Sequence, residues 1–107
     1  MQTRLQALTL ADTIQEMKFE WDAAKARRNE RKHGVSFQEA ATVLGDPLAL
    51  TYPDPDHSTR EQRFITVGMA RSGRVLLVAH TDRGENIRII SARPTTRRER
   101  EHYEETS

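Results

Sequence analysis

The 107-residue sequence contains no cysteine. This absence excludes disulfide bonds, thiolate zinc sites and cysteine nucleophiles, and it is consistent with a reducing compartment. Long apolar runs are also missing, since stretches such as Val75–Ala79 are far shorter than a membrane span, and the amino terminus lacks the apolar segment of a signal peptide. We therefore expect a soluble, cytoplasmic protein.

Short motifs of several enzyme classes are absent as well. The sequence has no glycine-rich phosphate loop, no nucleophile elbow and no zincin helix. The segment Asp54-Pro55-Asp56-His57 offers metal-ligating residue types, but no second motif with ligand spacing accompanies it, and Asp-Pro-Asp is also a good turn sequence. We expect neither a metal nor a cofactor.

Apolar residues are scarce relative to charged ones. Hydrophobic residues make up 36% of the chain and charged residues 31%, which leaves a small core for one domain and favours an oligomer or a complex. We divide the chain into an amino-terminal extension, residues 1–16, and one domain, residues 17–107. Leu10, Ile14 and Met17 fall at helical spacing, so the extension is either a loosely docked helix or unstructured.

Lysine is rare: only Lys18, Lys25 and Lys32 of the seventeen basic residues are lysines. Arginine binds phosphate oxygens through two parallel hydrogen bonds, although a bias in codon composition would give the same excess. The charge is also uneven. The segment from Arg83 to Arg100 has six arginines against two glutamates, a local charge of +4, whereas the whole chain carries +1. This asymmetry indicates a polyanionic partner.

The first half of the domain has helical patterns. Residues 19–21 alternate like a short strand, Asp22 is suited to cap a helix over 23–33, and Gly34 is suited to end it. Ser36 and Glu39 form a capping box for a second helix that Gly45-Asp46-Pro47 stops. The apolar stripe of this second helix consists of Phe37, Ala40, Ala41 and Leu44.

The second half reads as strands followed by a helix. Strands are predicted over 48–52, 64–70, 75–81 and 86–93, and glycines 73 and 84 lie in short turns that make the last three an antiparallel meander. Residues 53–63 read as a long polar loop. Thr96 and Glu99 form another capping box, which predicts a terminal helix through Tyr103. The expected fold class is α+β, with a short strand, two helices, an antiparallel sheet and a carboxyl-terminal helix.

The first helix places Lys25, Arg28 and Lys32 on one face, with Arg27 and Arg31 on the adjoining flank. Such a basic face is suited to follow a sugar–phosphate backbone, but in a highly charged protein it is more commonly a solvated surface.

The last predicted strand carries two arginines. Alternation places Arg88 and Arg93 on opposite faces unless a bulge intervenes. Arg93 stands where Pro94 ends the pairing, and from there its side chain could point into a cleft beside the last helix. The alternative is an ordinary ion pair with Glu99 or Glu20.

Four histidines could serve in acid–base chemistry, because imidazole titrates near neutral pH; they are His33, His57, His80 and His102. Most histidines have no such role. His33 precedes a helix-ending glycine, where a cation is stabilised by the helix dipole, and His80 lies in a predicted strand, where a packed residue is expected.

Several separated motifs resemble the BrnT family of bacterial toxins over residues 18–105. They are Phe19-Glu20-Trp21-Asp22-x-x-Lys25, Asn29-x-x-Lys32-His33-Gly34-Val35-Ser36-Phe37-x-Glu39-Ala40, Asp46-Pro47, Arg63-Phe64-Ile65, Gly68, and Ile87-Arg88-Ile89-Ile90-Ser91-Ala92-Arg93-x-x-Thr96-x-x-Glu99-Arg100-x-x-Tyr103. The resemblance implies a RelE-like fold and a metal-independent endoribonuclease that cleaves RNA and inhibits translation. It also implies a BrnA-type ribbon-helix-helix antitoxin, which binds operator DNA as part of the complex.

From the family motifs we hypothesise a site in which Arg93, supported by Arg88, stabilises the charge that develops on the phosphate. His33 and Tyr103 would transfer protons or stack on bases, with Glu99 or Arg98 orienting neighbours. The catalytic candidates are Arg93, Arg88, Lys32, His33 and Tyr103, and the RNA-binding candidates are Lys25, Arg28, Arg97 and Arg98. Two alternatives stay open: a module that binds nucleic acid without cleaving it, and a basic helix that serves only to dock an acidic antitoxin segment.

Overall fold

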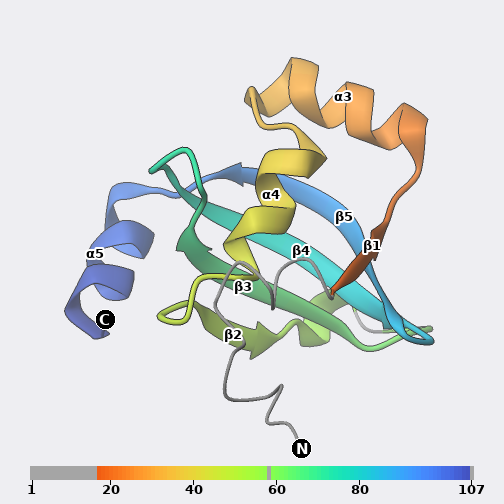
Figure 1. Ribbon diagram of the computed structural model, residues 1–107. Coiled ribbons are helices and arrows are strands. Elements are labelled where there is room, and N and C mark those ends of the chain that lie inside the picture. Colours follow the sequence, from red (N-terminus) through yellow and green to blue (C-terminus); the bar gives the residue numbers. More distant parts are fainter. Residues whose placement is uncertain (1–16, 58, 107) are drawn as a thin grey trace, which may run out of the picture.

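The structure is a computed structural model that describes residues 17–57 and 59–106. It contains three α-helices and five strands in the predicted order (Figure 1). The elements are β1 (Lys18–Glu20), α3 (Ala23–His33), α4 (Phe37–Val43), β2 (Leu50–Pro53), the 3-10 turn η1 (Pro55–His57), β3 (Arg63–Met69), β4 (Val75–Arg83), β5 (Asn86–Pro94) and α5 (Arg97–Thr106). The helical spacing of Leu10 and Ile14 lies outside the described residues. Within the described part of the chain, no helix is long and apolar enough to span a membrane.

The five strands form one sheet in the order β1-β5-β4-β3-β2. The predicted meander of β3, β4 and β5 is confirmed as antiparallel, and β2 pairs antiparallel with β3. The short strand β1 instead runs parallel to β5 and pairs with it only over Asn86 to Arg88. The sheet is therefore mixed, because α3 and α4 return the chain to the far side of the sheet before β2 begins.

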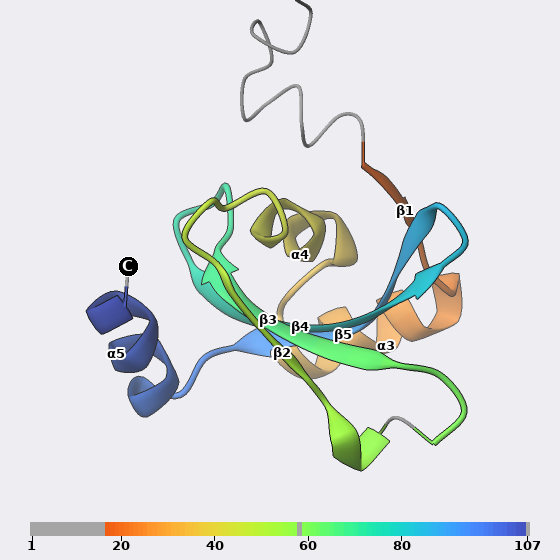
Figure 2. The same cartoon turned by 90° about the horizontal axis from the view of Figure 1, so that it is seen from below.

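One face of the sheet carries the core, and α4 packs across it onto β3, β4 and β5 (Figure 2). Phe37, Ala40 and Val43 of α4 are fully buried against the strand residues Leu76 and Val78. Ala41 is buried as predicted, whereas Leu44 packs only at the margin of this core because the helix ends at Val43. We call the opposite side of the sheet the second face.

The predicted helix caps are confirmed. The Asp22 side chain accepts a hydrogen bond from the Lys25 amide at 2.9 Å, and Gly34 ends α3 in the left-handed region, with φ of 69°. Ser36 caps α4 by accepting a hydrogen bond from the Glu39 amide at 3.0 Å, but only this half of the predicted capping box forms, since the Glu39 carboxylate bonds Ser72 and Arg74. At α5 the exchange is reciprocal: the Thr96 amide donates to Glu99 at 2.8 Å, and the Glu99 amide donates to Thr96 at 3.1 Å.

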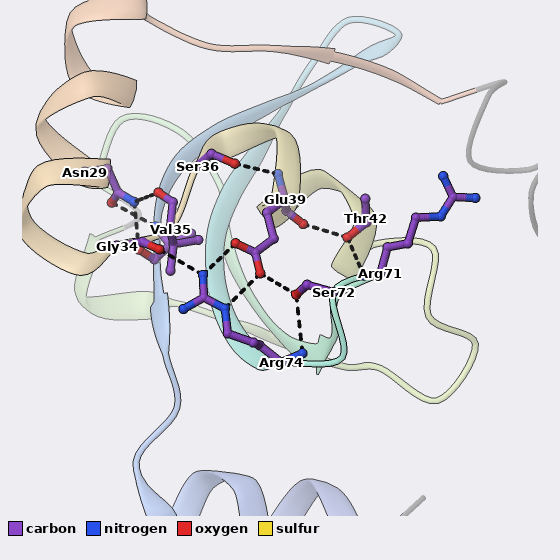
Figure 3. Close-up of polar contacts among 10 residues, drawn as sticks. Asn29, Gly34, Val35, Ser36, Glu39, Thr42, Arg71, Ser72 and Arg74 are labelled. Atoms are coloured by element: carbon purple, nitrogen blue, oxygen red, sulfur yellow. Dashed lines mark hydrogen bonds and ion pairs between the residues drawn. The ribbon is translucent and has the colours of Figure 1, made fainter.

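The Glu39 carboxylate forms tertiary contacts with the hairpin between β3 and β4. Its two oxygens accept hydrogen bonds from Arg74, and one of them also accepts a hydrogen bond from Ser72 (Figure 3). Arg74 donates further to the Gly34 carbonyl at 2.9 Å. The Arg74 guanidinium lowers the pKa of Glu39 against the opposing effect of partial burial. This network ties the turn between α3 and α4 to the β3–β4 hairpin.

The terminal helix is held by Asp46. Its side chain accepts hydrogen bonds from the Tyr103 hydroxyl at 2.6 Å, the Met69 amide at 2.8 Å and the Leu48 amide at 2.9 Å. Gly68 permits this approach, since a Cβ there would lie 2.9 Å from the Ala49 side chain and 3.1 Å from Asp46. Although partial burial opposes ionisation, the hydrogen bonds from Met69 and Tyr103 set the pKa of Asp46 below its usual value.

Candidate functional site

A bulge in β5 determines which side chains reach the second face. Ser91 pairs with Ala79, and Ile89 pairs with the next residue, His80, so Ile90 is an extra residue in β5. Ile89 and Ala92 are consequently both in the core although they are three positions apart. Strict alternation would separate Arg88 from Arg93, but the bulge is the exception that the sequence analysis allowed for. Arg88, Ser91 and Arg93 all lie on the second face.

One side chain of α3 bonds the part of the β5 edge that β1 does not reach. Asn29 is buried and donates from Nδ2 to the Ala92 carbonyl at 2.8 Å and to the Val35 carbonyl at 3.0 Å. Its Oδ1 accepts the Ala92 amide at 3.1 Å. The amide group thus replaces a neighbouring strand and fixes the basic helix beside the bulge. Sequence reasoning gave Asn29 no role, although a lone amide facing inward in a charged helix was the available signal.

A groove lies between α3 and the bulge, with a volume of about 350 Å³. We call it the α3 groove; its lining residues are Lys25, Arg28, Asn29, Lys32, His33, Ile90 and Ser91. The predicted common face of Lys25, Arg28 and Lys32 is confirmed, and none of these three cations forms an ion pair with another described residue. No acidic side chain of the described residues lines the groove, so it is suited to an anion.

Arg93 lies two residues beyond Ser91 and is bound to the start of α5. Its Nη1 and Nη2 donate to the two carboxylate oxygens of Glu99 at 2.9 Å each, and Nη1 also donates to the Pro94 carbonyl at 3.1 Å. The Arg93 guanidinium holds the pKa of Glu99 at about 2, and Glu99 in turn raises the pKa of Arg93. The ion pair with Glu99, which the sequence analysis named as an alternative, is present.

This ion pair does not use all of the guanidinium. Arginine has five N–H donors, and the three hydrogen bonds to Glu99 and Pro94 leave two without a partner among the described residues. The Arg93 side chain is 37% exposed. It is therefore oriented by Glu99 and can still donate to a ligand oxygen.

Arg88 is on the same face but in a separate place. It donates to Glu20 at 2.8 Å across the β1–β5 pair, and Asn86 donates to the other oxygen of Glu20 at 3.0 Å. The cross-strand partners of Arg88 and Arg93 are Thr81 and Leu77, four residues apart on β4, which corresponds to about 13 Å along the strand. The structure does not bring the two arginines together.

A second groove, with a volume of about 330 Å³, lies between the second face and α5. We call it the α5 groove; its lining residues are Tyr52, Ile65, Val67, Leu77, Glu99 and His102. The Tyr52 hydroxyl and His102 Nε2 are hydrogen-bonded at 3.0 Å. Sequence reasoning gave Tyr52 no role and could not pair it with His102, because the two residues are fifty positions apart and no local motif links them.

The other candidates of α5 are distributed over both sides of the helix. Tyr103 is 5% exposed and contacts Asp46, so its hydroxyl lies in the contact that holds the helix to the sheet. Arg97 and Arg98 are exposed, and Arg97 forms an ion pair with Glu101 at 3.0 Å.

The remaining histidines lie apart from both grooves. His80 is packed as expected: it stacks on Phe64, bonds Thr66 at 2.7 Å, and burial lowers its pKa. His57 contacts Asp54 at 3.0 Å in η1. Over residues 17–57 and 59–106, no three His, Asp or Glu side chains converge in a group that could hold a metal ion.

Comparison with known families decides the identity of the chain. The family described as the ribonuclease toxin BrnT of type II toxin–antitoxin systems matches residues 21–99. The chain belongs to the BrnT family. The match spans every residue that lines the α3 groove as well as Arg93 and Glu99, whereas His102 of the α5 groove lies beyond it. No curated protein matches the sequence.

A solved structure also resembles this BrnT-family chain. The crystal structure of the Brucella abortus ribonuclease toxin BrnT superposes with a TM-score of 0.59 at 24% sequence identity, over 76% of this chain and 99% of the Brucella chain. This similarity confirms the predicted α+β fold. The assignment of roles to individual side chains rests on the geometry described above.

Proposed function

We propose that this BrnT-family protein is a metal-independent endoribonuclease that cleaves RNA and thereby inhibits translation. The observation that carries the proposal is the α3 groove, in which Lys25, Arg28 and Lys32 converge beside Ser91 without an acidic neighbour in the lining. Cations that are free of ion pairs bind a polyanion by releasing its counterions. The family membership supports the reaction class, and the groove supports the position proposed for the RNA backbone.

The catalytic position in this proposal is the stretch of the second face from Ser91 to Arg93. These two residues alternate onto the same face and stand about 7 Å apart along the strand. A backbone held in the α3 groove and crossing β5 would therefore pass the two free donors of Arg93. The ion pair with Glu99 fixes the direction of the guanidinium before RNA arrives, and such preorganisation is what charge stabilisation in a transition state requires.

Cleavage without a metal uses the ribose 2′-hydroxyl. Its oxygen forms a bond to phosphorus, the bond from phosphorus to the 5′-oxygen breaks, one proton leaves the 2′-hydroxyl and one joins the 5′-oxygen. Arg93 stabilises the negative charge that develops on the phosphate oxygens. His33 is the histidine of the α3 groove, and we assign proton transfer to it, with Lys32 beside it as the cation that contacts the phosphate.

The remaining candidates have supporting roles. Arg88 extends the positive charge of the second face toward β1, and Tyr103 keeps α5, and with it Glu99, against the sheet. Arg97 and Arg98 are exposed near the start of α5, where they add long-range attraction for RNA.

The test is cleavage by the purified, antitoxin-free protein in the presence of a chelator. Wild-type protein should give discrete RNA products, and Arg93→Ala should lose about 100-fold or more of the rate, the cost of removing one charge-stabilising donor. Arg71→Ala is the matched control, because it removes an exposed arginine of the β3–β4 hairpin that lines neither groove. A salt-sensitive gel shift without products, or an unimpaired Arg93→Ala variant, would contradict the proposal and favour a module that only binds nucleic acid.

The proposed partner is a BrnA-type ribbon-helix-helix antitoxin that neutralises the enzyme and contacts operator DNA as part of the complex. The family belongs to type II toxin–antitoxin systems, which supports a protein antitoxin. A small ribbon-helix-helix protein encoded by a neighbouring gene is the expected partner, and its co-expression should restore growth and co-purify the pair. If Lys25, Arg28 and Lys32 served only to dock that partner, charge reversal there would abolish co-purification and leave RNA cleavage intact.

A further inference from the structure

The two grooves differ in chemistry. The α3 groove is cationic, whereas the α5 groove has an apolar floor of Ile65, Val67 and Leu77 and, over residues 17–57 and 59–106, no lysine or arginine in its lining. Its lining includes the carboxylate of Glu99, which stays ionised because Arg93 depresses its pKa to about 2. An anionic carboxylate next to aliphatic side chains disfavours a phosphate. The groove is suited to a flat, neutral ring with polar atoms at its edge.

We propose that the α5 groove binds one unstacked nucleobase of the RNA, with the base against the ring of Tyr52. The inference rests on the proposed function, which makes RNA the ligand, and adds where a base lies. Single-stranded RNA is commonly recognised by aromatic side chains on which splayed bases stack, since every base presents a π face. A volume of about 330 Å³ falls within the range of ligand-binding clefts.

The α5 groove lies next to Arg93, and this position determines which base can enter it. Leu77, on the floor of the α5 groove, is the direct cross-strand neighbour of Arg93 on the second face, and Glu99, on its wall, is the ion-pair partner of Arg93. A nucleotide whose phosphate accepts the free donors of Arg93 therefore has its base within reach of Leu77 and Tyr52. The backbone would run from the α3 groove over Ser91 to Arg93, with the base turning toward α5.

Tyr52 is presented for this contact. Its side chain belongs to the edge strand β2, and 41% of the residue is exposed. The hydrogen bond to His102 joins β2 to α5 and restrains the ring at the mouth of the groove. Glu99 and His102 are three residues apart on α5 and face the same groove, so the helix supplies its polar wall.

Binding to RNA that cannot be cleaved tests the proposal on the full-length protein. The probes are short single-stranded RNAs with methylated 2′-hydroxyls, one intact and the others each lacking one base. Wild-type protein should show one position where loss of the base weakens binding about ten-fold or more. Tyr52→Ala should lose that position dependence, and Tyr52→Phe, which keeps the ring and loses the hydrogen bond to His102, should retain most of it.

Salt dependence separates the two grooves. Tyr52→Ala should weaken binding and leave the slope of affinity against salt concentration unchanged, whereas Arg28→Ala should reduce the slope by about one charge. Melting temperatures of Tyr52→Ala and Tyr52→Phe show that each variant is folded. Should Tyr52→Ala not fold, the wild-type scan over base-less positions and the Tyr52→Phe variant still decide the matter.

Two results would overturn the base pocket. One is wild-type binding that is equally tight at every base-less position, and the other is a Tyr52→Ala variant that keeps the wild-type pattern. Loss of antitoxin binding by Tyr52→Ala, with RNA binding unchanged, would assign the groove to an apolar antitoxin side chain instead. Wild-type protein that neither binds nor cleaves RNA would remove the proposed function itself, whereas cleavage without any dependence on a single base removes only the pocket.

Discussion

Arg93 and Glu99 form a bidentate ion pair across the junction between β5 and α5, and the Nη1–Oε1 and Nη2–Oε2 distances are both 2.9 Å. The same carboxylate accepts the Thr96 amide at 2.8 Å. Glu99 therefore caps the helix, orients the arginine and lines the α5 groove. One side chain links the stability of α5 to the geometry proposed for RNA cleavage.

The ion pair predicts a loss of stability in acid. Arg93 lowers the pKa of Glu99 from 4.5 to about 2, so the folded state binds this proton less readily than the unfolded chain does. The contribution of Glu99 is fully present above about pH 4.5 and declines as the pH falls toward 2. Urea unfolding of wild-type protein and Glu99→Gln across this window should show a difference that shrinks with acidification. Glu105→Gln, at an exposed position of the same helix, should leave the free energy of unfolding unchanged. A difference between wild type and Glu99→Gln that stays constant with pH would contradict the ion pair.

The α3 groove predicts unequal effects of two neighbouring arginines. Arg28 lines the groove and Arg27 does not, although both are exposed on the same helix. Arg28→Ala should lower RNA affinity and reduce the salt slope by about one, whereas Arg27→Ala should change affinity only weakly. Fluorescence anisotropy between 50 and 200 mM salt, roughly the range over which such contacts are lost, measures both quantities. Equal effects of the two substitutions would indicate a diffuse basic surface without a defined groove.

The contact between α3 and β5 predicts a large loss of stability on substitution of Asn29. Asn29→Ala removes three hydrogen bonds and leaves the backbone groups of Ala92 and the Val35 carbonyl without partners. We expect the free energy of unfolding to fall by roughly 2–4 kcal/mol, because unsatisfied buried polar groups are costly. Chemical denaturation measures the change, and Glu30→Ala, at the exposed neighbouring position, is the control. A loss no larger than that of the control would show that α3 is held by its apolar contacts alone.

Local features of the fold were predictable because their causes are local. Asp22 and Ser36 cap helices by accepting hydrogen bonds from amides three residues away, and Gly34 ends α3 through a carbonyl four residues away, so their sequence spacing is sufficient to identify them. The alternating apolar runs likewise identified β3, β4 and β5. The parallel pairing of β1 was not deduced, because it depends on how two helices return the chain and not on the three residues of the strand.

The candidate site was predictable only in part, for the same physical reason. The common face of Lys25, Arg28 and Lys32 follows from helical periodicity. The orientation of Arg93 depends on a register shift between β4 and β5, and the α5 groove depends on a contact between Tyr52 and His102. Neither interaction leaves a signature in the neighbouring sequence, since each arises from pairing between distant segments.

The extra residue in β5 has a consequence for any insertion or deletion in this strand. Deleting Ile90 would restore strict pairing with β4 and would leave Arg88, Ser91 and Arg93 on the second face and Ile89 and Ala92 in the core. If Ile90 were kept and the bulge were lost, every side chain on one side of position 90 would change faces. Either Arg93 would enter the apolar interior and Ala92 would face water, or Ile89 would leave the interior and Arg88 would replace it. The chain therefore tolerates the loss of position 90 better than the loss of the bulge around it, and the length of this strand matters as much as its composition.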